Sequence, residues 1–135
     1  MSLFRSIFPE KSRTFSGQRW TKISLRTVHL LGVAGMGGGF LYSSPEQFWK
    51  PYLIATLISG IAFMLQEIWS NGVWLIQVRG IAVFLKLILL SFLLFSSGFE
   101  VIIIFSVIII SGVISHAPGE LRYFSVFHGR RIEAL

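Results

Sequence analysis

The chain has 135 residues, of which 53% are hydrophobic and only 13% are charged, and its formal net charge is +6. Soluble domains have about 25% charged residues, so this composition predicts a membrane protein with a single compact bundle. The absence of cysteine excludes disulfides, thiolate metal sites, iron–sulfur clusters and haem attached through cysteine. Nucleic-acid binding is not expected, because the basic residues stand at the ends of apolar runs and form no patch.

Residues 1–22 are predicted to form a tail on the cytoplasmic side of a membrane. The opening stretch SLFRSIF places Leu3, Phe4, Ile7 and Phe8 on one helical face, so it could lie on the membrane surface as an interfacial helix. The apolar run that follows lacks a cleavage site of small residues. A cleaved signal peptide is therefore not expected.

Four hydrophobic segments follow, each near the length of about 20 residues that a helix needs to cross a hydrocarbon core of about 30 Å. They cover about residues 23–42, 52–68, 80–99 and 101–115. The last is rich in β-branched residues, but a lone strand in lipid would leave its backbone unpaired, so a helix is expected. The short SSGFE connection predicts a tight hairpin of the last two segments. The sequence therefore predicts an all-α polytopic membrane protein, with four transmembrane helices in an up-down-up-down bundle over residues 23–116.

The lysines and arginines give this bundle an orientation. Ten of the twelve lie before residue 27, in the connection of the second and third segments, or in the C-terminal tail. Lys50 lies on the opposite side, and Lys86 lies inside the third segment. The positive-inside rule predicts that both termini are cytoplasmic. The expected location is a bacterial-type inner (plasma) membrane. All four tryptophans fall at segment ends, as in an aromatic belt.

This orientation gathers the ionisable side chains of the segments in the cytoplasmic half of the bundle. Arg26 lies in the leading end of the first segment, Glu67 closes the second, and Lys86 lies about two turns into the third. Intramembrane ionisable groups are costly and frequently functional. Arg26, Glu67 and Lys86 form the predicted polar cluster, in which Lys86 either pairs with Glu67 or extends toward the inner interface.

Three interpretations of His29 and His116 are open. The two imidazoles could hold a b-type haem between the first and fourth segments, with Gly32 and Gly112 letting the porphyrin approach the backbones. No metal site is expected apart from these iron ligands. Alternatively, a quinone or lipid-headgroup pocket could use His29, Arg26 or Lys86. In the third interpretation His29 makes an interhelical hydrogen bond and His116 is a solvated group at the interface.

The glycines of the first segment predict close helix packing. Gly32, Gly35 and Gly39 lie on one arc of the helix, and Thr56 and Gly60 repeat the small-residue spacing on the second segment. Small residues at such spacing let two helix backbones approach closely in a membrane. The first two helices are therefore expected to cross at short distance.

Residues 117–135 are predicted to be a basic, amphiphilic cytoplasmic tail. It either stays at anionic lipid headgroups through Arg130 and Arg131, or docks to a partner subunit through Tyr123, Phe124 and Phe127. The sequence has no paired-carboxylate site, zinc-ligand spacing, P-loop or nucleophile elbow. Enzymatic activity is therefore not expected.

The stretch TVHLLGVAGMGGGFLY resembles the leading helix of the copper-resistance protein D-type membrane family, in which a His-Leu pair precedes small residues and a Gly-Gly step. LISGIAFML and FLKLILL are similar to the second and third helices of that group. The resemblance covers about residues 27–95. It implies a copper-uptake or cytochrome-b-like four-helix membrane fold, with His29 and Lys86 as functional positions. The methionine- and histidine-rich metal positions of the family are missing here.

These features predict a small integral membrane protein that is a non-catalytic subunit or anchor of a membrane complex. The complex would be a redox one if the haem b or quinone site exists. Its neighbours would be the lipid bilayer with its anionic headgroups, and either partner membrane subunits or further copies of the chain. The alternative is a small transporter or metal-uptake component with a polar path along His29, Lys86 and Glu67.

Overall fold

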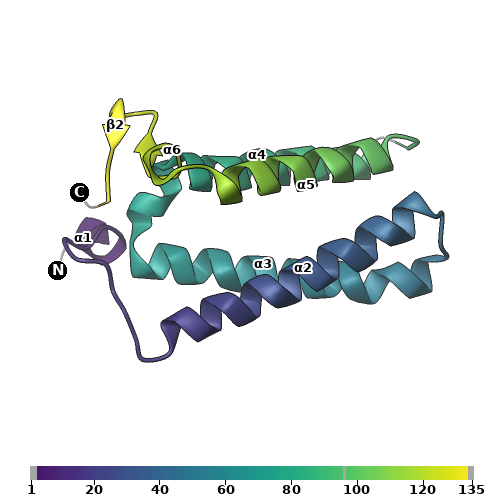
Figure 1. Cartoon of the computed structure of the whole chain (residues 1–135), viewed down its shortest axis with the longest axis horizontal. Helices are drawn as coiled ribbons and strands as arrows, with labels where there is room; N and C mark the ends of the chain where they lie inside the picture. Colours follow the sequence, from purple (N-terminus) through teal and green to yellow (C-terminus); the bar gives the residue numbers. More distant parts are fainter. Residues whose placement is uncertain (1–2, 96, 134–135) are drawn as a thin grey trace.

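Two antiparallel helical hairpins form most of the molecule and lie beside one another along the same axis (Figure 1). The computed structural model describes residues 3–95 and 97–133. The first hairpin pairs α2 with α3, and the second pairs α4 with α5. The helices are α1 (Leu3–Ile7), α2 (Gln18–Leu41), α3 (Glu46–Ser70), α4 (Val78–Ser91), α5 (Glu100–His116) and α6 (Gly119–Arg122). The prediction of a mainly helical, all-α fold is confirmed.

Short elements join and close the two hairpins. The 3-10 helix η1 (Gly72–Ile76) connects α3 to α4, and η2 (Phe92–Leu94) ends α4. The strands β1 (Phe124–Ser125) and β2 (Arg130–Arg131) pair antiparallel in the C-terminal segment, which the sequence predicted only as an amphiphilic tail. Both ends of the described chain lie at the same end of the hairpins (Figure 1).

The four long helices coincide with the four hydrophobic segments, but their lengths differ. α2 and α3 have 24 and 25 residues, which is about 36 Å each at 1.5 Å per residue. Among the described residues, α3 is the one helix that is long and apolar enough to cross a membrane, and α5 is apolar but shorter. Membrane crossing by all four helices therefore stays a prediction.

α4 ends earlier than the hydrophobic segment 80–99. It has 14 residues and continues for three more as η2. The hydroxyl of Ser91 donates to the carbonyl of Ile88 at 2.6 Å, and the chain turns at Gly98 with a φ of +93°. A serine that binds its own backbone competes with regular helix, and only glycine adopts this φ without strain. The apolar run therefore includes the turn as well as the helix.

α2 and α3 pack along a seam of small residues. Gly32 lies against Thr56 and Gly39 lies against Trp49. Gly35 lies between these two glycines on the same face of α2. A Cβ added at Gly32 would stand 2.8 Å from the backbone nitrogen of Thr56. Backbone atoms cannot move aside as a flexible side chain can. The predicted close crossing of the first two helices is confirmed.

The hydrophobic core is small, and most large apolar side chains are on the outside. The buried apolar residues of the described chain are Met36, Val73, Trp74, Ala82, Ile104 and Ile132. In contrast, Leu30 is 69% exposed and Ile58 is 65% exposed, whereas Glu67 is only 5% exposed. A soluble domain has the opposite distribution, because burial of apolar surface is what stabilises it.

The connection between the hairpins is buried. Val73 and Trp74 of η1 are 1% and 3% exposed, so Trp74 is a core residue and does not belong to an aromatic belt. Gly72 makes room for Ile7, because a Cβ there would stand 2.6 Å from the Ile7 side chain. α1 therefore docks on η1 through Ile7, while Phe4 remains 54% exposed on the helix predicted to be interfacial.

Candidate functional site: a buried carboxylate at one end of the hairpins

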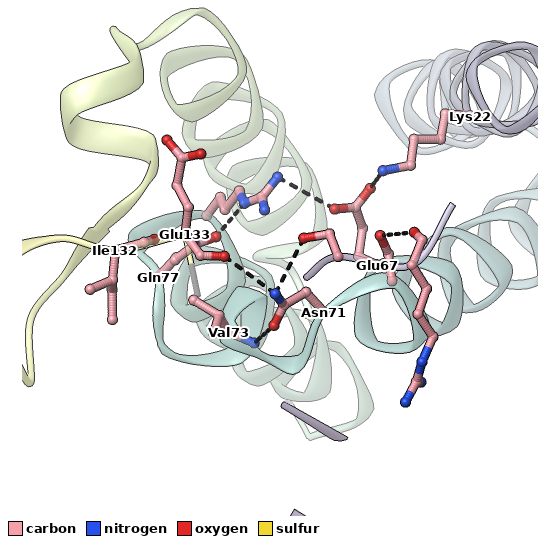
Figure 2. A network of polar contacts seen from close by, with 11 residues as sticks. Lys22, Glu67, Asn71, Val73, Gln77, Ile132 and Glu133 are labelled. Atoms are coloured by element: carbon pink, nitrogen blue, oxygen red, sulfur yellow. Dashed lines mark hydrogen bonds and ion pairs between the residues drawn. The ribbon is translucent and has the colours of Figure 1, made fainter. Parts of the chain in front are cut away.

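The carboxylate of Glu67 is the centre of a polar network at the end where the two chain termini lie. Glu67 stands in the last turn of α3, and its side chain is 6% exposed. One of its oxygens forms an ion pair with the ammonium of Lys22 on α2, and the other lies 3.4 Å from the guanidinium of Arg79 on α4 (Figure 2). A buried charge is tolerated only when it is paired, and here three helices supply the charges.

Arg79 connects this carboxylate to the C-terminal segment. Its Nε donates to the side-chain oxygen of Gln77 at 2.7 Å, and the amide nitrogen of Gln77 donates to the carbonyl of Ile132 at 2.6 Å (Figure 2). The Arg79 guanidinium also lies 4.7 Å from the centre of the Tyr123 ring. Guanidinium groups bind aromatic faces at such distances. The start of α4 is thus joined to the tail by a side-chain hydrogen bond and a ring contact.

Asn71 joins both terminal segments to the end of α3. Its amide nitrogen lies 3.2 Å from the hydroxyl of Ser12 and 3.3 Å from the carbonyl of Glu133, so it donates toward both ends of the chain (Figure 2). Its oxygen accepts from the backbone nitrogen of Val73 at 3.1 Å and caps η1. Asn71 therefore holds the two terminal segments against the end of α3 in addition to capping η1.

The N-terminal segment is bound along the same edge. The backbone nitrogen of Arg13 donates to the carbonyl of Ser70, and the Ser70 hydroxyl donates back to the carbonyl of Arg13, both at 2.8 Å. The Arg13 guanidinium donates to the carbonyls of Trp69 and Ser6, at 3.1 and 2.7 Å. We call the assembly of residues 6–13, 69–77 and 123–133 the end cap.

A buried serine holds the C-terminal strands against the connection of the two hairpins. Ser125 is fully buried and forms an isolated β-bridge with Gln77. Its hydroxyl lies 3.0 Å from Nδ1 of His128. Hydrogen bonds to Glu133, and also to Glu120, raise the pKa of Arg131 on β2, which therefore remains a cation at any physiological pH. The predicted tail is a folded part of the end cap.

A small polar cavity of about 240 Å³ lies inside the end cap. Glu67, Asn71, Arg79, Tyr123 and Glu133 are among the residues that line it. Its walls come from both hairpins and both terminal segments. The Glu67 carboxylate therefore lies in a cavity at the place where the two hairpins meet.

His29 has an interhelical partner. Its Nδ1 lies 3.0 Å from the carbonyl of Thr56 and 3.3 Å from the hydroxyl of Ser59, and its ring lies over Gly60 on α3. Because a carbonyl can only accept, Nδ1 carries the proton and donates to Thr56. The interhelical hydrogen bond that the sequence allowed for His29 is therefore present.

The residues of the predicted haem site do not form one pocket. His116 is exposed, and its Nδ1 lies 2.9 Å from the carbonyl of Gly112 on its own helix. The face of Gly32 is covered by Thr56 of α3, whereas a Cβ at Gly112 would meet nothing within 4 Å. A porphyrin needs small residues open on both sides, and here the α2 side is filled. The arrangement does not fit a haem bridged between His29 and His116.

The predicted polar cluster is also divided. Lys86 donates to the hydroxyl of Ser111 on α5 at 3.0 Å, and Glu67 is paired with Lys22 and Arg79 instead. Arg26 lies near this end of α3, with its guanidinium 4.9 Å from the centre of the Phe63 ring. Of the two alternatives open for Lys86, pairing with Glu67 is not what the structure shows, because the hydroxyl of Ser111 on the neighbouring helix accepts from the ammonium.

Several residues of the end cap were not singled out from the sequence. Asn71, Gln77 and Arg79 stand in the stretch NGVWLIQVR, where two amides flank an apolar run. That pattern could have indicated a polar network, because amide side chains next to a buried 3-10 turn are themselves buried and need hydrogen-bond partners. Tyr123 was singled out as a docking residue for a partner, and it docks on Arg79 of its own chain.

Comparison of the chain with protein-family models, curated proteins and solved structures finds no match in any of the three. The resemblance to the copper-resistance protein D-type group therefore stays a prediction from the quoted residues.

Replacing His29 with alanine is expected to reduce the free energy of unfolding by about 1 kcal/mol, because the Thr56 carbonyl loses its interhelical donor. Replacing His116 is expected to change it by less than about 0.5 kcal/mol, since that imidazole is exposed and bonds only within α5. Unfolding of the detergent-solubilised variants by SDS, followed by circular dichroism, measures both changes. A Soret band that either substitution abolishes would contradict the packing role.

Proposed function

We propose that this chain is a four-crossing integral membrane protein with both termini cytoplasmic, acting as a non-catalytic subunit or anchor of a membrane complex. The observation that supports it is the inverted distribution of side chains. Large apolar residues cover the outside of the hairpins, while Glu67, Gln77 and Ser125 are buried. In lipid the exposed leucines and isoleucines meet hydrocarbon, and polar groups must find partners inside the protein.

Helix dimensions support membrane crossing by both hairpins. α2 and α3 exceed the hydrocarbon thickness of about 30 Å, and α4 with η2 spans about 27 Å when the 3-10 rise is included. The 17 residues of α5 give about 26 Å. Shorter spans are accommodated by local thinning of the bilayer at modest cost.

The end cap supports the role of an anchor. It binds both terminal segments and the connection of the hairpins into one folded platform, and its cavity is lined by charges that already have partners. Both oxygens of the Glu67 carboxylate contact cations of the chain itself, so neither is left open to bind a transported cation. A transporter path along His29, Lys86 and Glu67 would need these groups to face one another, and each instead contacts a different helix partner.

The absence of cysteine gives a direct test of the topology. A single cysteine at Gln47 lies in the first turn of α3, and one at Ser97 lies in the connection of η2 to α5, both distant from the end cap. A cysteine at Ser16 lies beside the end cap, and all three positions are exposed. We expect a membrane-impermeant maleimide to label Gln47→Cys and Ser97→Cys in intact cells. Ser16→Cys should react only after permeabilisation.

Labelling of Ser16→Cys in intact cells, or recovery of the chain in the soluble fraction, would contradict the proposal. The subunit role is checked separately by native electrophoresis of membranes solubilised in mild detergent. The tagged chain should migrate with other polypeptides, or with further copies, in fixed stoichiometry. Migration as a monomer would leave the topology intact and contradict the subunit role.

A further inference from the structure

A second hollow lies outside the network of Glu67, at the start of α2. Its volume is about 570 Å³, and it is formed where the N-terminal segment, the first three turns of α2 and the end of α3 meet. Arg19, Lys22 and Arg26 line it together with Ile23 and Ser70. We call it the α2 groove. Residues three, four and seven apart lie on one helix face, so the three cations point to the same side.

The α2 groove has an excess of positive charge. Among the residues that the structure describes, no acidic one lines it. The nearest carboxylate is Glu67, which pairs with both Lys22 and Arg79, so one negative charge is shared by two cations. Arg26 contacts a phenyl ring, and no ion pair with Arg19 or Arg26 occurs in the part of the chain that the structure describes. Two cations of the groove therefore lack a counter-charge from the protein.

The surroundings of the α2 groove favour a lipid over a free anion. Ile23 in its wall is 42% exposed, and Leu30, one turn beyond Arg26 on the same face, is 69% exposed. Trp20 is 71% exposed beside the cations. Tryptophan concentrates at the headgroup level of membranes, and exposed apolar residues beyond it contact acyl chains. A phospholipid fits this arrangement, because its phosphate can contact the cations while its acyl chains contact the exposed apolar side chains. Inorganic phosphate can contact only the cations.

The spacing of the cations selects the kind of headgroup. Arg19 and Arg26 are seven residues apart, so their Cα atoms are separated by about 10 Å along the helix. One phosphate would have to draw both side chains together, whereas two phosphates in one headgroup can contact them separately. Each cation near an anionic surface contributes on the order of 1 kcal/mol to binding.

We propose that the α2 groove binds the headgroup of an anionic phospholipid, and prefers a headgroup with two phosphates to a headgroup with one. The inference rests on the proposed membrane location, because it places Arg19 and Arg26 at the level of the cytoplasmic headgroups.

The test uses the full chain in detergent, freed of lipid, with binding followed by tryptophan fluorescence or native mass spectrometry. The probes are cardiolipin, phosphatidylglycerol, phosphatidylcholine and inorganic phosphate. We expect affinity to fall in that order. The variant R19Q/R26Q should weaken cardiolipin binding by about 30-fold, as expected for the loss of two cations. Lys22 is left in place because it pairs with Glu67.

The matched control is K11Q/K50Q, which removes the same charge from two exposed positions outside the groove. Its cardiolipin affinity should stay within about two-fold of the parent, since distant exposed charges contribute little. Equal weakening by both variants, or inorganic phosphate bound as tightly as cardiolipin, would overturn the proposal. If R19Q/R26Q alone loses the lipid while the maleimide pattern contradicts four crossings, the lipid site stands and the proposed topology fails.

Discussion

Replacing Glu67 by glutamine is expected to lower the free energy of unfolding by about 3–5 kcal/mol, the largest effect of any single charge removal in this chain. Glutamine has nearly the same shape, so packing is preserved and the change is electrostatic. Lys22 and Arg79 would then be half-buried cations facing each other without the carboxylate that now separates them. An uncompensated buried charge is much more costly than the loss of one hydrogen bond.

The control for this prediction removes carboxylates whose ion pairs are exposed. Glu46 pairs with Lys50 at 2.7 Å and Glu120 pairs with Arg131 at 2.7 Å, and all four side chains are largely in solvent. Glu46→Gln and Glu120→Gln should each cost less than about 1 kcal/mol. Unfolding of the purified variants in detergent, monitored by circular dichroism against SDS concentration, ranks the three. Similar losses for all three would show that Glu67 has no special role.

A double-mutant cycle locates the effect. If Glu67 and Lys22 interact as the structure shows, the losses from Glu67→Gln and Lys22→Gln should not add, and the coupling should exceed about 1 kcal/mol. The same cycle with Lys86→Gln in place of Lys22→Gln should be additive, because Lys86 contacts Ser111 and not Glu67. Strong coupling of Glu67 to Lys86 would restore the pairing with Glu67, one of the two alternatives that the sequence left open for Lys86.

The helical hairpin of α2 and α3 could be predicted from local patterns. The small residues at 32, 35 and 39 and at 56 and 60 repeat at helical spacing, and this periodicity alone indicates which faces meet. The partners of the charges could not be chosen in the same way, because they depend on the register of the two helices. Once Gly32 lies against Thr56, antiparallel packing places Lys22, three turns earlier, against Glu67, three turns later.

The end cap could not be predicted, because its bonds join parts of the chain that share no local pattern. Arg13 contacts the carbonyl of Trp69, and Asn71 contacts the carbonyl of Glu133. In the sequence the tail is basic and aromatic, which is equally typical of a solvated tail. Trp74 illustrates the same limit, since a tryptophan at the end of an apolar segment suits a membrane interface, yet here it is 3% exposed.

Replacing Gly32 by alanine is the second large effect expected, with a loss of about 1–3 kcal/mol in the free energy of unfolding. The new Cβ would face the backbone nitrogen of Thr56 and the carbonyl oxygen of Tyr52, each at 2.8 Å. Neither is the end of a flexible side chain, so α2 and α3 must separate. Separation would also lengthen the 3.0 Å contact between His29 and the Thr56 carbonyl.

Gly38 provides the matched control on the same helix, since a Cβ there would meet nothing within 4 Å. Gly38→Ala should therefore be neutral, or stabilising by up to about 1 kcal/mol, because alanine is the better helix former. The two substitutions have the same chemistry and differ only in the face of α2 that they alter, so opposite signs in SDS unfolding would locate the seam at Gly32. If Gly32→Ala were as stable as Gly38→Ala, the two helices would not be in contact there. His29 would then lack the interhelical acceptor that explains its presence in an apolar helix.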